Sequence, residues 1–298
     1  MLWHRYRPMP CGLDHIVHAV RDLDAAAEFY RRAGFMVGVR NRHPWGTHNR
    51  VVQLKNFYIE ILEIAEPDKI VPHGRRSFSF GAFNRDFLAS HEGLSMLLLS
   101  SRDAAEDARQ FEAASIGNSD VFEFAREGTR PDGSVVKLAF SLAFAEDKES
   151  PHARFAVCQH HFPENFWNAA FQDHANGARA AAGVTLVDDN PAGRVAFLRA
   201  FTGDELQSTS DGIVAQTENG QIEIMRRTAF QDKFGRTPGL SGEGMLLNAL
   251  CFVVDDLDRV AECHRRNGVV SYRHQGRLVI SGEIAYGATL AFETAKHD

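Results

Sequence analysis

Short apolar runs and amphipathic stretches alternate along the chain in a recurring order. Near the N-terminus the apolar run LDHIVHAV is followed by the amphipathic stretch DLDAAAEFYRRAG and then by three further apolar runs. Short runs rich in β-branched residues predict strands, whereas apolar residues three and four positions apart predict a helix. An Asp before the amphipathic stretch and Gly34 at its end are typical start and stop signals of a helix. The pattern predicts a βαβββ unit over residues 12–64.

The three strands after this helix are expected at residues 35–39, 51–54 and 58–64. A loop, NRHPWGTHNR, separates the first two, because Pro and Gly favour turns. Loops at the mouth of a sheet often contact ligands, so this loop supplies candidate site residues. They are His43, Trp45, His48 and Asn49. The polar segment over residues 66–91 is expected to be an irregular connection, with room for a short helix, that could cover a pocket.

The same order of elements recurs, which predicts further units over residues 93–161, 182–226 and 246–294. Aligning VRDLDAAAEFYRRAGF from Val20 with VDDLDRVAECHRRNGV from Val254 gives roughly nine identities in sixteen positions. The fourth strands also agree, with YIEIL, QIEIM and LAFET in the first, third and fourth units. In the second unit, TRPDGS is a strong turn signal between two strands. We therefore predict a chain built from four βαβββ modules.

A chain of 298 residues folds more comfortably as two domains than as one. Pairing the modules predicts an N-terminal domain over residues 12–165 and a C-terminal domain over residues 182–298. Residues 166–181 belong to a segment rich in aromatic and amide side chains and are the expected linker, and residues 1–11 are the expected tail.

Composition and charge narrow the classes of function. The hydrophobic content of 44% and the charged content of 24% are ordinary for a soluble globular protein. A net charge of −6 without a long basic run argues against nucleic acid or an anionic membrane as partner and favours a small molecule. The four cysteines form no CxxC pair, and no apolar run reaches the roughly 18 residues of a membrane span. We expect a cytoplasmic monomer or homodimer.

Several motifs together resemble a known superfamily. LDHIVHAV, the DLD-capped helix and the YIEIL strand resemble the vicinal oxygen chelate superfamily, which includes glyoxalase I, type I extradiol dioxygenases and bleomycin-resistance proteins. More narrowly, DHIVHAV, HPWGTHN and YIEIL, followed by FAVCQHH and HANGA, resemble the glyoxalase-like domain family. The resemblance implies an α+β fold in which pairs of modules form two domains with cupped mixed sheets.

The resemblance also implies a divalent metal in the cup, held by side chains from the first and fourth strands of each module. In the first module these positions fall on His15 and Glu60. The residues alone leave another interpretation open, namely a hydrogen-bonded core histidine and a glutamate that faces water. A Glu between Ile59 and Ile61 is nevertheless a costly buried residue without a cation or partner. We therefore predict His15 and Glu60 as metal ligands.

The second module departs from this pattern. Its first strand has Ser95 where His or Gln would be expected, and its fourth strand ends in Gln159, His160 and His161. Alternation along a strand places Gln159 and His161 on one face and His160 on the other. Because a Phe-Pro pair then ends the strand near the mouth of the cup, we predict that the first two face the cavity. His161 is then the third metal ligand and Gln159 a substrate contact.

The remaining candidates surround these ligands. The predicted catalytic base is His48 or a Glu60 that leaves the metal during turnover. The predicted substrate contacts in the first module are His18, His43, Trp45 and Asn49. Turn chemistry is an open alternative for the loop residues. A packed core histidine is the alternative for His18, which has the opposite parity to His15.

The internal repeats supply a comparison for the metal site. His15 aligns with Ala249 in the fourth module, and the third module has only GVTLV in that region. Packing alone gives no reason for a histidine in one module and not in the others, so we predict a metal site in the N-terminal half only. The C-terminal half carries Glu223 and Glu293 without a histidine partner and is expected to be a support or lid.

These residues predict a metal-dependent glyoxalase-like enzyme that acts on a small substrate with vicinal oxygens, by lyase, isomerase or dioxygenase chemistry. Two histidines and a carboxylate leave coordination positions open and suit Fe or Mn, while Zn and Ni accept the same ligands. The alternative is a metal-free binding or resistance protein that sequesters an aromatic or apolar ligand. The 22 Phe and three Trp residues, several of them in FSFGAF and FPENFW, favour a large aromatic-lined pocket and so this alternative.

Overall fold

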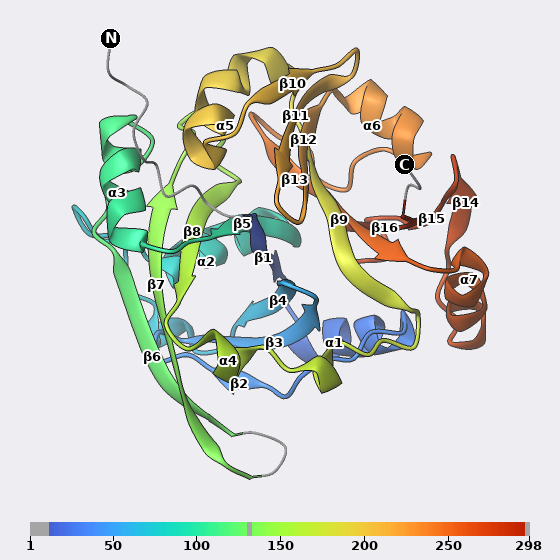
Figure 1. Cartoon of the computed structure of the whole chain (residues 1–298), viewed down its shortest axis with the longest axis horizontal. Helices are drawn as coiled ribbons and strands as arrows, with labels where there is room; N and C mark the ends of the chain where they lie inside the picture. The colour runs from blue at the N-terminus through green and yellow to red at the C-terminus, as the bar shows by residue number, and fades with distance from the viewer. Residues whose placement is uncertain (1–11, 130–132, 296–298) are drawn as a thin grey trace.

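Two eight-stranded mixed sheets dominate the structure (Figure 1). The computed structural model describes residues 12–129 and 133–295, so the predicted tail and the middle of the TRPDGS turn lie outside the described residues. In Figure 1 the blue-to-green N-terminal half fills the left and lower parts of the molecule, and the yellow-to-red C-terminal half fills the upper right. The predicted α+β class with two cupped mixed sheets is confirmed.

The two sheets share one topology. The N-terminal strands are β1 (Leu13–Ala19), β2 (Asn41–Arg42), β3 (Thr47–Leu54), β4 (Phe57–Ile64), β5 (Gly93–Ser100), β6 (Phe122–Thr129), β7 (Val135–Ala145) and β8 (Arg154–His160). The C-terminal strands are β9 (Ala178–Val187), β10 (Leu206–Ser208), β11 (Gly212–Thr217), β12 (Gly220–Met225), β13 (Leu246–Val254), β14 (Tyr272–His274), β15 (Arg277–Ile280) and β16 (Thr289–Thr294). Their orders are β2-β3-β4-β1-β5-β8-β7-β6 and β10-β11-β12-β9-β13-β16-β15-β14. In each sheet the first strands of two modules pair antiparallel at the centre, and each pairs in parallel with the fourth strand of its own module.

A helix follows the first strand of every module. These helices are α1 (Leu23–Arg32), α3 (Ala104–Ala113), α5 (Val195–Thr202) and α7 (Leu257–Arg266). The other helices are α2 (Phe80–Ser90), α4 (Pro163–Phe166) and α6 (Arg227–Phe234), with short 3-10 turns at Pro67–Lys69, Ala169–Phe171 and Pro191–Arg194. The helix α2 is the short helix for which the connection expected over residues 66–91 had room, and it forms the second part of that connection.

The start and stop signals of α1 act as expected. The Asp22 carboxylate accepts the amide hydrogen of Ala25 at 2.9 Å, which caps the first turn. At the other end Gly34 has φ +90°, and a Cβ there would lie 2.9 Å from the backbone nitrogen of Asn176. Glycine is therefore needed both for the turn and for the close approach of the linker.

The expected strand over residues 35–39 does not form. Phe35 packs between Phe252 and Phe292 of the other half, with ring centroids 5.0 and 6.0 Å away. The amide of Met36 donates to Nδ1 of His174 at 3.0 Å, so part of this backbone bonds to the linker instead of a neighbouring strand. The second strand of the module is only the two-residue β2.

The predicted linker is fixed to the N-terminal half. His174 Nε2 donates to the carbonyl oxygen of Gln53 at 2.8 Å, and the side-chain amide of Asn176 donates to the carbonyl oxygen of Ala33 at the same distance. The last residues of the predicted linker already belong to β9. Arg259 of the C-terminal half donates to the carbonyl oxygens of Ala175 and His174 at 3.1 and 3.3 Å, so this segment contacts both halves.

One apolar core joins the two sheets. It contains Ile16 and Phe29 from the N-terminal half together with Phe252 and Phe292 from the C-terminal half. A second cluster, which includes Val17, lies on the opposite face of the N-terminal sheet. That opposite face is where a ligand cavity could form. Among the described residues, no helix combines the length and apolar character needed to cross a bilayer.

His18 belongs to the contact between the halves, so its prediction as a substrate contact is wrong. The neutral ring donates from Nε2 to the carbonyl oxygen of Tyr286 at 2.9 Å and accepts the hydroxyl of Tyr30 at Nδ1, 2.8 Å away. Its side chain is fully buried on the face of the sheet that packs against α1 and the C-terminal half. The packed-histidine interpretation is the one the structure supports.

We expect acid to destabilise the protein partly through His18. Burial lowers the pKa of His18 to about 4, although the Tyr286 carbonyl acts in the opposite direction. In the unfolded chain the pKa is about 6.5. As the pH falls from about 6.5 towards about 4, the unfolded state takes up a proton that the folded state excludes, so the free energy of unfolding decreases.

Urea unfolding at a series of pH values measures this slope. The variant His18→Gln should flatten it in part, because burial also lowers the pKa of His264 to about 4 and that residue remains. His161→Gln is the control for replacing a histidine at the surface, because His161 is exposed beyond β8. An unchanged slope in His18→Gln would contradict the assignment.

Candidate metal and substrate site

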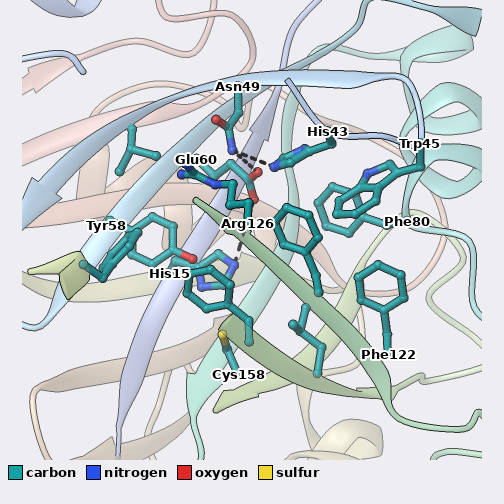
Figure 2. Close-up of a pocket in the computed structure, with 15 residues that line it drawn as sticks. His15, His43, Trp45, Asn49, Tyr58, Glu60, Phe80, Phe122, Arg126 and Cys158 are labelled. Atoms are coloured by element: carbon teal, nitrogen blue, oxygen red, sulfur yellow. Dashed lines mark hydrogen bonds and ion pairs between the residues drawn. The ribbon is translucent and has the colours of Figure 1, made fainter. Parts of the chain in front are cut away.

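A cavity of about 70 Å³ lies on the face of the N-terminal sheet opposite the shared core (Figure 2). Its polar wall consists of His15, His43, Asn49, Tyr58, Glu60, Arg126 and Cys158. Its apolar wall consists of Trp45, Val51, Phe80, Phe122, Phe124, Phe140, Leu142 and Phe166. Strands of both N-terminal modules contribute, and α2 and α4 each add one phenyl ring. This volume is well below the roughly 300–1,000 Å³ that is usual for drug-sized ligands, so the site is limited to a small molecule and is not the large pocket expected from the aromatic content.

His15 is held in one orientation by its neighbour. Its Nδ1 lies 2.5 Å from the Asp14 carboxylate, and its ring stacks on Tyr58 with centroids 4.2 Å apart. Burial raises the pKa of Asp14, but the charges and hydrogen bonds of His160 and His15 outweigh it and hold the pKa well below its usual range. The carboxylate must therefore accept the Nδ1 proton. In the neutral ring, Nε2 then keeps its lone pair, as in carboxylate–histidine–metal arrangements.

Glu60 lies beside His15 on the same wall of the cavity. The distance from His15 Nε2 to Glu60 Oε2 is 4.0 Å, and the Asn49 amide donates to Oε1 at 2.5 Å. The side chain of Glu60 is 8% exposed, and no Lys or Arg nitrogen of the described residues lies within 4.0 Å of it. A buried carboxylate without such a partner is costly unless a cation completes the site. Both side chains therefore fit a bound divalent ion.

The second module adds no ligand at the equivalent positions. Aligning the two modules by the helix caps Asp22 and Asp103 places Met96 at the position of His15. His15 pairs with Tyr58, and Met96 pairs with Arg154. By the same register, Ala156 corresponds to Glu60. The residue singled out in the sequence, Ser95, instead donates its hydroxyl hydrogen to Asn84 of α2 at 2.7 Å. The ion would thus have two protein ligands from these strands and keep its other positions for water or substrate.

A second group of donor atoms lies directly behind His15. Asp14, Cys158 and His160 place ligand atoms within 4.8 Å of one another, the one such cluster in the described part of the chain. His160 Nε2 lies 3.0 Å from Asp14 Oδ2, so the same carboxylate holds both imidazoles. Asp14 and His160 line a separate hollow beside Asn219 of the C-terminal half. The Asp14 carboxylate already contacts both imidazoles, so this group orients His15.

The predicted roles of His161 and Gln159 are wrong, because the parity chosen for β8 was reversed. Cys158 and His160 are on the cavity face of the strand. Gln159 faces α3, where it accepts the amide hydrogen of Ala104 at 3.1 Å. His161 is exposed beyond the strand, and its Nε2 pairs with the Ser141 hydroxyl at 2.7 Å. His160 therefore takes the place beside the site that was assigned to His161.

His48 is also on the wrong face to be the catalytic base. Residues 47–50 of the expected loop belong to β3, and alternation turns Asn49 and Val51 into the cavity and His48 away from it. Its Nδ1 lies 3.1 Å from Arg40 Nη1, and its Nε2 lies 3.5 Å from a Glu66 oxygen. His48 belongs to a charged cluster on the other side of the sheet.

The other three residues of that segment do line the cavity. His43 stacks on Trp45 with centroids 4.6 Å apart, and its Nδ1 pairs with the Thr47 hydroxyl at 2.8 Å. Its Nε2 lies 3.4 Å from the Asn49 amide, which also holds Glu60. Burial lowers the pKa of His43, so the ring is neutral at pH 7. His43 is therefore placed to take up a proton where His48 is not.

Three residues of the polar wall escaped prediction: Tyr58, Arg126 and Cys158. Strand alternation contains the signal for the first two, because Tyr58 shares a face with Glu60, and Arg126 shares one with the phenylalanines of FEFAR. Burial raises the pKa of the Tyr58 hydroxyl, so this group keeps its proton and can donate a hydrogen bond to a ligand. Burial likewise raises the pKa of the Cys158 thiol.

The C-terminal cup is built differently. Glu223 forms an ion pair with Lys233 and accepts the Thr185 hydroxyl at 3.1 Å. Glu293 forms an ion pair with Arg277 at 2.7 Å. Neither β9 nor β13 contains a histidine. The carboxylates of this cup are thus neutralised by cationic side chains, whereas Glu60 is not.

Comparison with known proteins identifies the family of this chain. A family model described as a glyoxalase-like domain matches residues 13–201, which span the N-terminal sheet and continue through α5. The chain belongs to the glyoxalase-like domain family. Its predicted membership in the vicinal oxygen chelate superfamily is thereby confirmed. A search of curated proteins finds no significant match.

Solved structures share the fold of this glyoxalase-like protein at low sequence identity. A hypothetical protein from Staphylococcus aureus matches with a TM-score of 0.65 and 12% identity, over 95% of this chain and 99% of that one. The Mn(II)-bound glyoxalase from Novosphingobium aromaticivorans matches with a TM-score of 0.54 and 11% identity, over 95% and 82%. A mutant of 4-hydroxymandelate synthase from Streptomyces coelicolor matches with a TM-score of 0.51 and 11% identity, over 97% and 94%.

Proposed function

We propose that this glyoxalase-like protein is a metal-dependent enzyme that acts on a small substrate with vicinal oxygens. The observation that carries the proposal is the buried pair of His15 and Glu60, with Nε2 and Oε2 4.0 Å apart on the wall of the cavity. A single ion at ordinary coordination distances, about 2.0–2.2 Å, can just reach both atoms. The Asp14 carboxylate that fixes the ring supports the same role, because oriented imidazoles are typical of metal ligands.

A bound Fe, Mn, Zn or Ni ion would supply Lewis-acid or redox chemistry towards the two substrate oxygens. The chain's own residues would position that substrate. The Tyr58 hydroxyl can donate to a substrate oxygen, and the aromatic wall keeps water away from the reacting atoms. A proton can be taken up at Nε2 of neutral His43 or at the Glu60 carboxylate. Lyase, isomerase and dioxygenase reactions on small, chelating substrates all suit this arrangement.

Metal analysis of protein purified without chelator tests the proposal. We expect one divalent ion per chain in the parent and none in His15→Ala. In Asp14→Asn the ring loses its fixed orientation, so metal affinity should fall about 10- to 100-fold without being abolished. A parent without a stoichiometric ion, or His15→Ala that binds metal as well as the parent, would overturn the proposal.

The variant His160→Ala separates the two groups of donor atoms. If the ion lies between His15 and Glu60, His160→Ala weakens binding only indirectly, through Asp14. Complete loss of metal in His160→Ala with retention in Glu60→Gln would place the ion in the group behind His15 instead and contradict the proposed site.

A metal-free binding protein for an aromatic or apolar compound is the second candidate. The observation in its favour is the cavity wall, on which indole and phenyl rings outnumber the two proposed ligands. Thermal-shift measurements distinguish the candidates, because a binding protein should be stabilised by an aromatic ligand equally with and without chelator. For either candidate we propose a small-molecule partner and no nucleic acid.

A further inference from the structure

Arg126 lines the cavity without an ion pair among the described residues, although the charge of Glu60 in the same cavity acts on it. The residue lies on β6, on the same face as Phe122 and Phe124, and lines the cavity with them. Its guanidinium donates to the carbonyl oxygen of Glu127 at 3.3 Å. No carboxylate of residues 12–129 or 133–295 lies within 4.0 Å of it, although Figure 2 shows Glu60 in the same region of the cavity.

Several other partly buried arginines in the described chain are paired with a carboxylate. Arg40 pairs with Glu63, Arg154 with Glu146, and Arg277 with Glu293. An arginine in a partly dry site without a carboxylate is unusual, because the loss of hydration is not compensated. Its planar array of donors matches the two oxygens of a carboxylate.

A second donor in the same wall also lacks an acceptor. The indole N–H of Trp45 is buried and has no hydrogen-bond partner among the residues described. Trp45 stands next to Phe122 and Phe124, with ring centroids 5.2 and 4.8 Å away. An indole N–H without an acceptor and a guanidinium without a carboxylate partner, set among aromatic rings, indicate that the ligand itself brings acceptor oxygens.

We propose that Arg126 binds the carboxylate of the substrate and that the cavity is specific for a compact aromatic acid. This inference rests on the proposed function of the same cavity and names its substrate class. The phenyl rings around Arg126 would contact the ring of the ligand, and the carboxylate would form a two-point contact with the guanidinium. The side chain of Glu60 remains free for the ion, because no ion pair joins it to Arg126.

Two probes of nearly equal shape test the proposal. Phenylglyoxylate and its neutral amide, phenylglyoxylamide, carry the same ring and the same vicinal oxygens and differ in charge. Titration calorimetry on the full chain, treated with chelator, removes any contribution of a metal to the comparison. We expect the parent to bind the acid at least tenfold more tightly than the amide.

In Arg126→Gln the affinity for the acid should fall on the order of tenfold to a hundredfold, and the affinity for the amide should not change. Arg126→Lys should retain part of the preference, since it keeps the charge but loses the planar array of donors. The matched control is Lys137→Gln, which removes one exposed positive charge from the neighbouring position of the same hairpin. Pyruvate, which lacks the ring, should bind more weakly than phenylglyoxylate.

Equal affinities of the parent for the two probes, no detectable binding of the acid, or an equal loss for both probes in Arg126→Gln would each overturn the proposal. So would a loss of the same size in Lys137→Gln. The metal content of the His15 variants does not depend on these results. The inference about Arg126 and the proposed metal site can therefore fail separately.

Discussion

Replacing Glu60 with Gln should abolish stoichiometric metal binding and, at the same time, stabilise the metal-free protein. The carboxylate is buried, and among the described residues it contacts the Asn49 amide and the ring of His15 but forms no ion pair with a Lys or Arg. An amide of the same shape cannot bind a divalent ion as an anionic ligand. It also removes a buried charge that the metal-free protein has to solvate poorly.

We expect metal affinity to fall at least 100-fold in Glu60→Gln, beyond the effect of losing an outer residue such as Asp14. Without metal, the free energy of unfolding should rise by about 1 kcal/mol, as measured by urea unfolding in chelator. The control is Glu63→Gln on the same strand. Glu63 pairs with Arg40 and accepts the amide hydrogen of Leu23 at 3.0 Å, so its loss should destabilise the protein and spare metal binding.

The opposite signs of the two stability changes make the test sharp. Neutralising a structural carboxylate such as Glu63 should lower the free energy of unfolding. Neutralising a metal ligand such as Glu60 should raise the free energy of unfolding of the metal-free protein. A destabilised, metal-free Glu60→Gln would show that the site was formed for packing and not for a cation.

The modules could be predicted because their signals are local. The Asp22 cap, Gly34 and the apolar spacing of α1 depend on neighbours within a few residues, and the repeated DLD motif places α7 in the same way. The strand β13 begins and ends where the run LLNALCFVV does. The pairing of His15 with Glu60 also follows from the sequence, since it needs only the parallel register of the first and fourth strands of one module.

The errors arose where a long-range contact decides the local structure. Residues 35–39 look like a strand, but Phe35 packs against the phenylalanines of the other half and the Met36 amide bonds to the linker. The first residue of β3 is set by the turn that closes on His43, and this start decides that Asn49 and not His48 faces the cavity. The parity of β8 depends in the same way on α3, which packs against Gln159. Such contacts lie far apart in the sequence.

Replacing Arg194 with Ala should cost about 3–5 kcal/mol of stability, because it leaves a buried carboxylate without its cation. Arg194 donates from Nε to Asp188 at 2.8 Å, and its Nη1 lies 3.1 Å from Asp147 and 2.5 Å from Glu149. The Asp188 side chain is 3% exposed. The last two carboxylates come from the N-terminal half, so one guanidinium joins the halves.

Thermal and urea unfolding measure the effect. Arg199→Ala is the matched control one turn along the same region, since Arg199 is 55% exposed and its partner Glu205 lies 4.0 Å away at the surface. That change should cost less than about 0.5 kcal/mol. Arg194→Met combined with Asp188→Asn should recover part of the loss, because it removes the unpaired charge as well as the pair. A cost for Arg194→Ala no greater than that for Arg199→Ala would contradict this account.

The shape of the unfolding transition carries a further expectation for Arg194→Ala. The apolar core that holds Phe35 against Phe252 and Phe292 is shared by both halves, and the variant leaves it intact. The loss of stability should therefore appear as a single transition at lower temperature and not as two separate ones. Two transitions would mean that the guanidinium, and not the shared core, couples the halves. In that case the cavity of the N-terminal half would be expected to form without the C-terminal half.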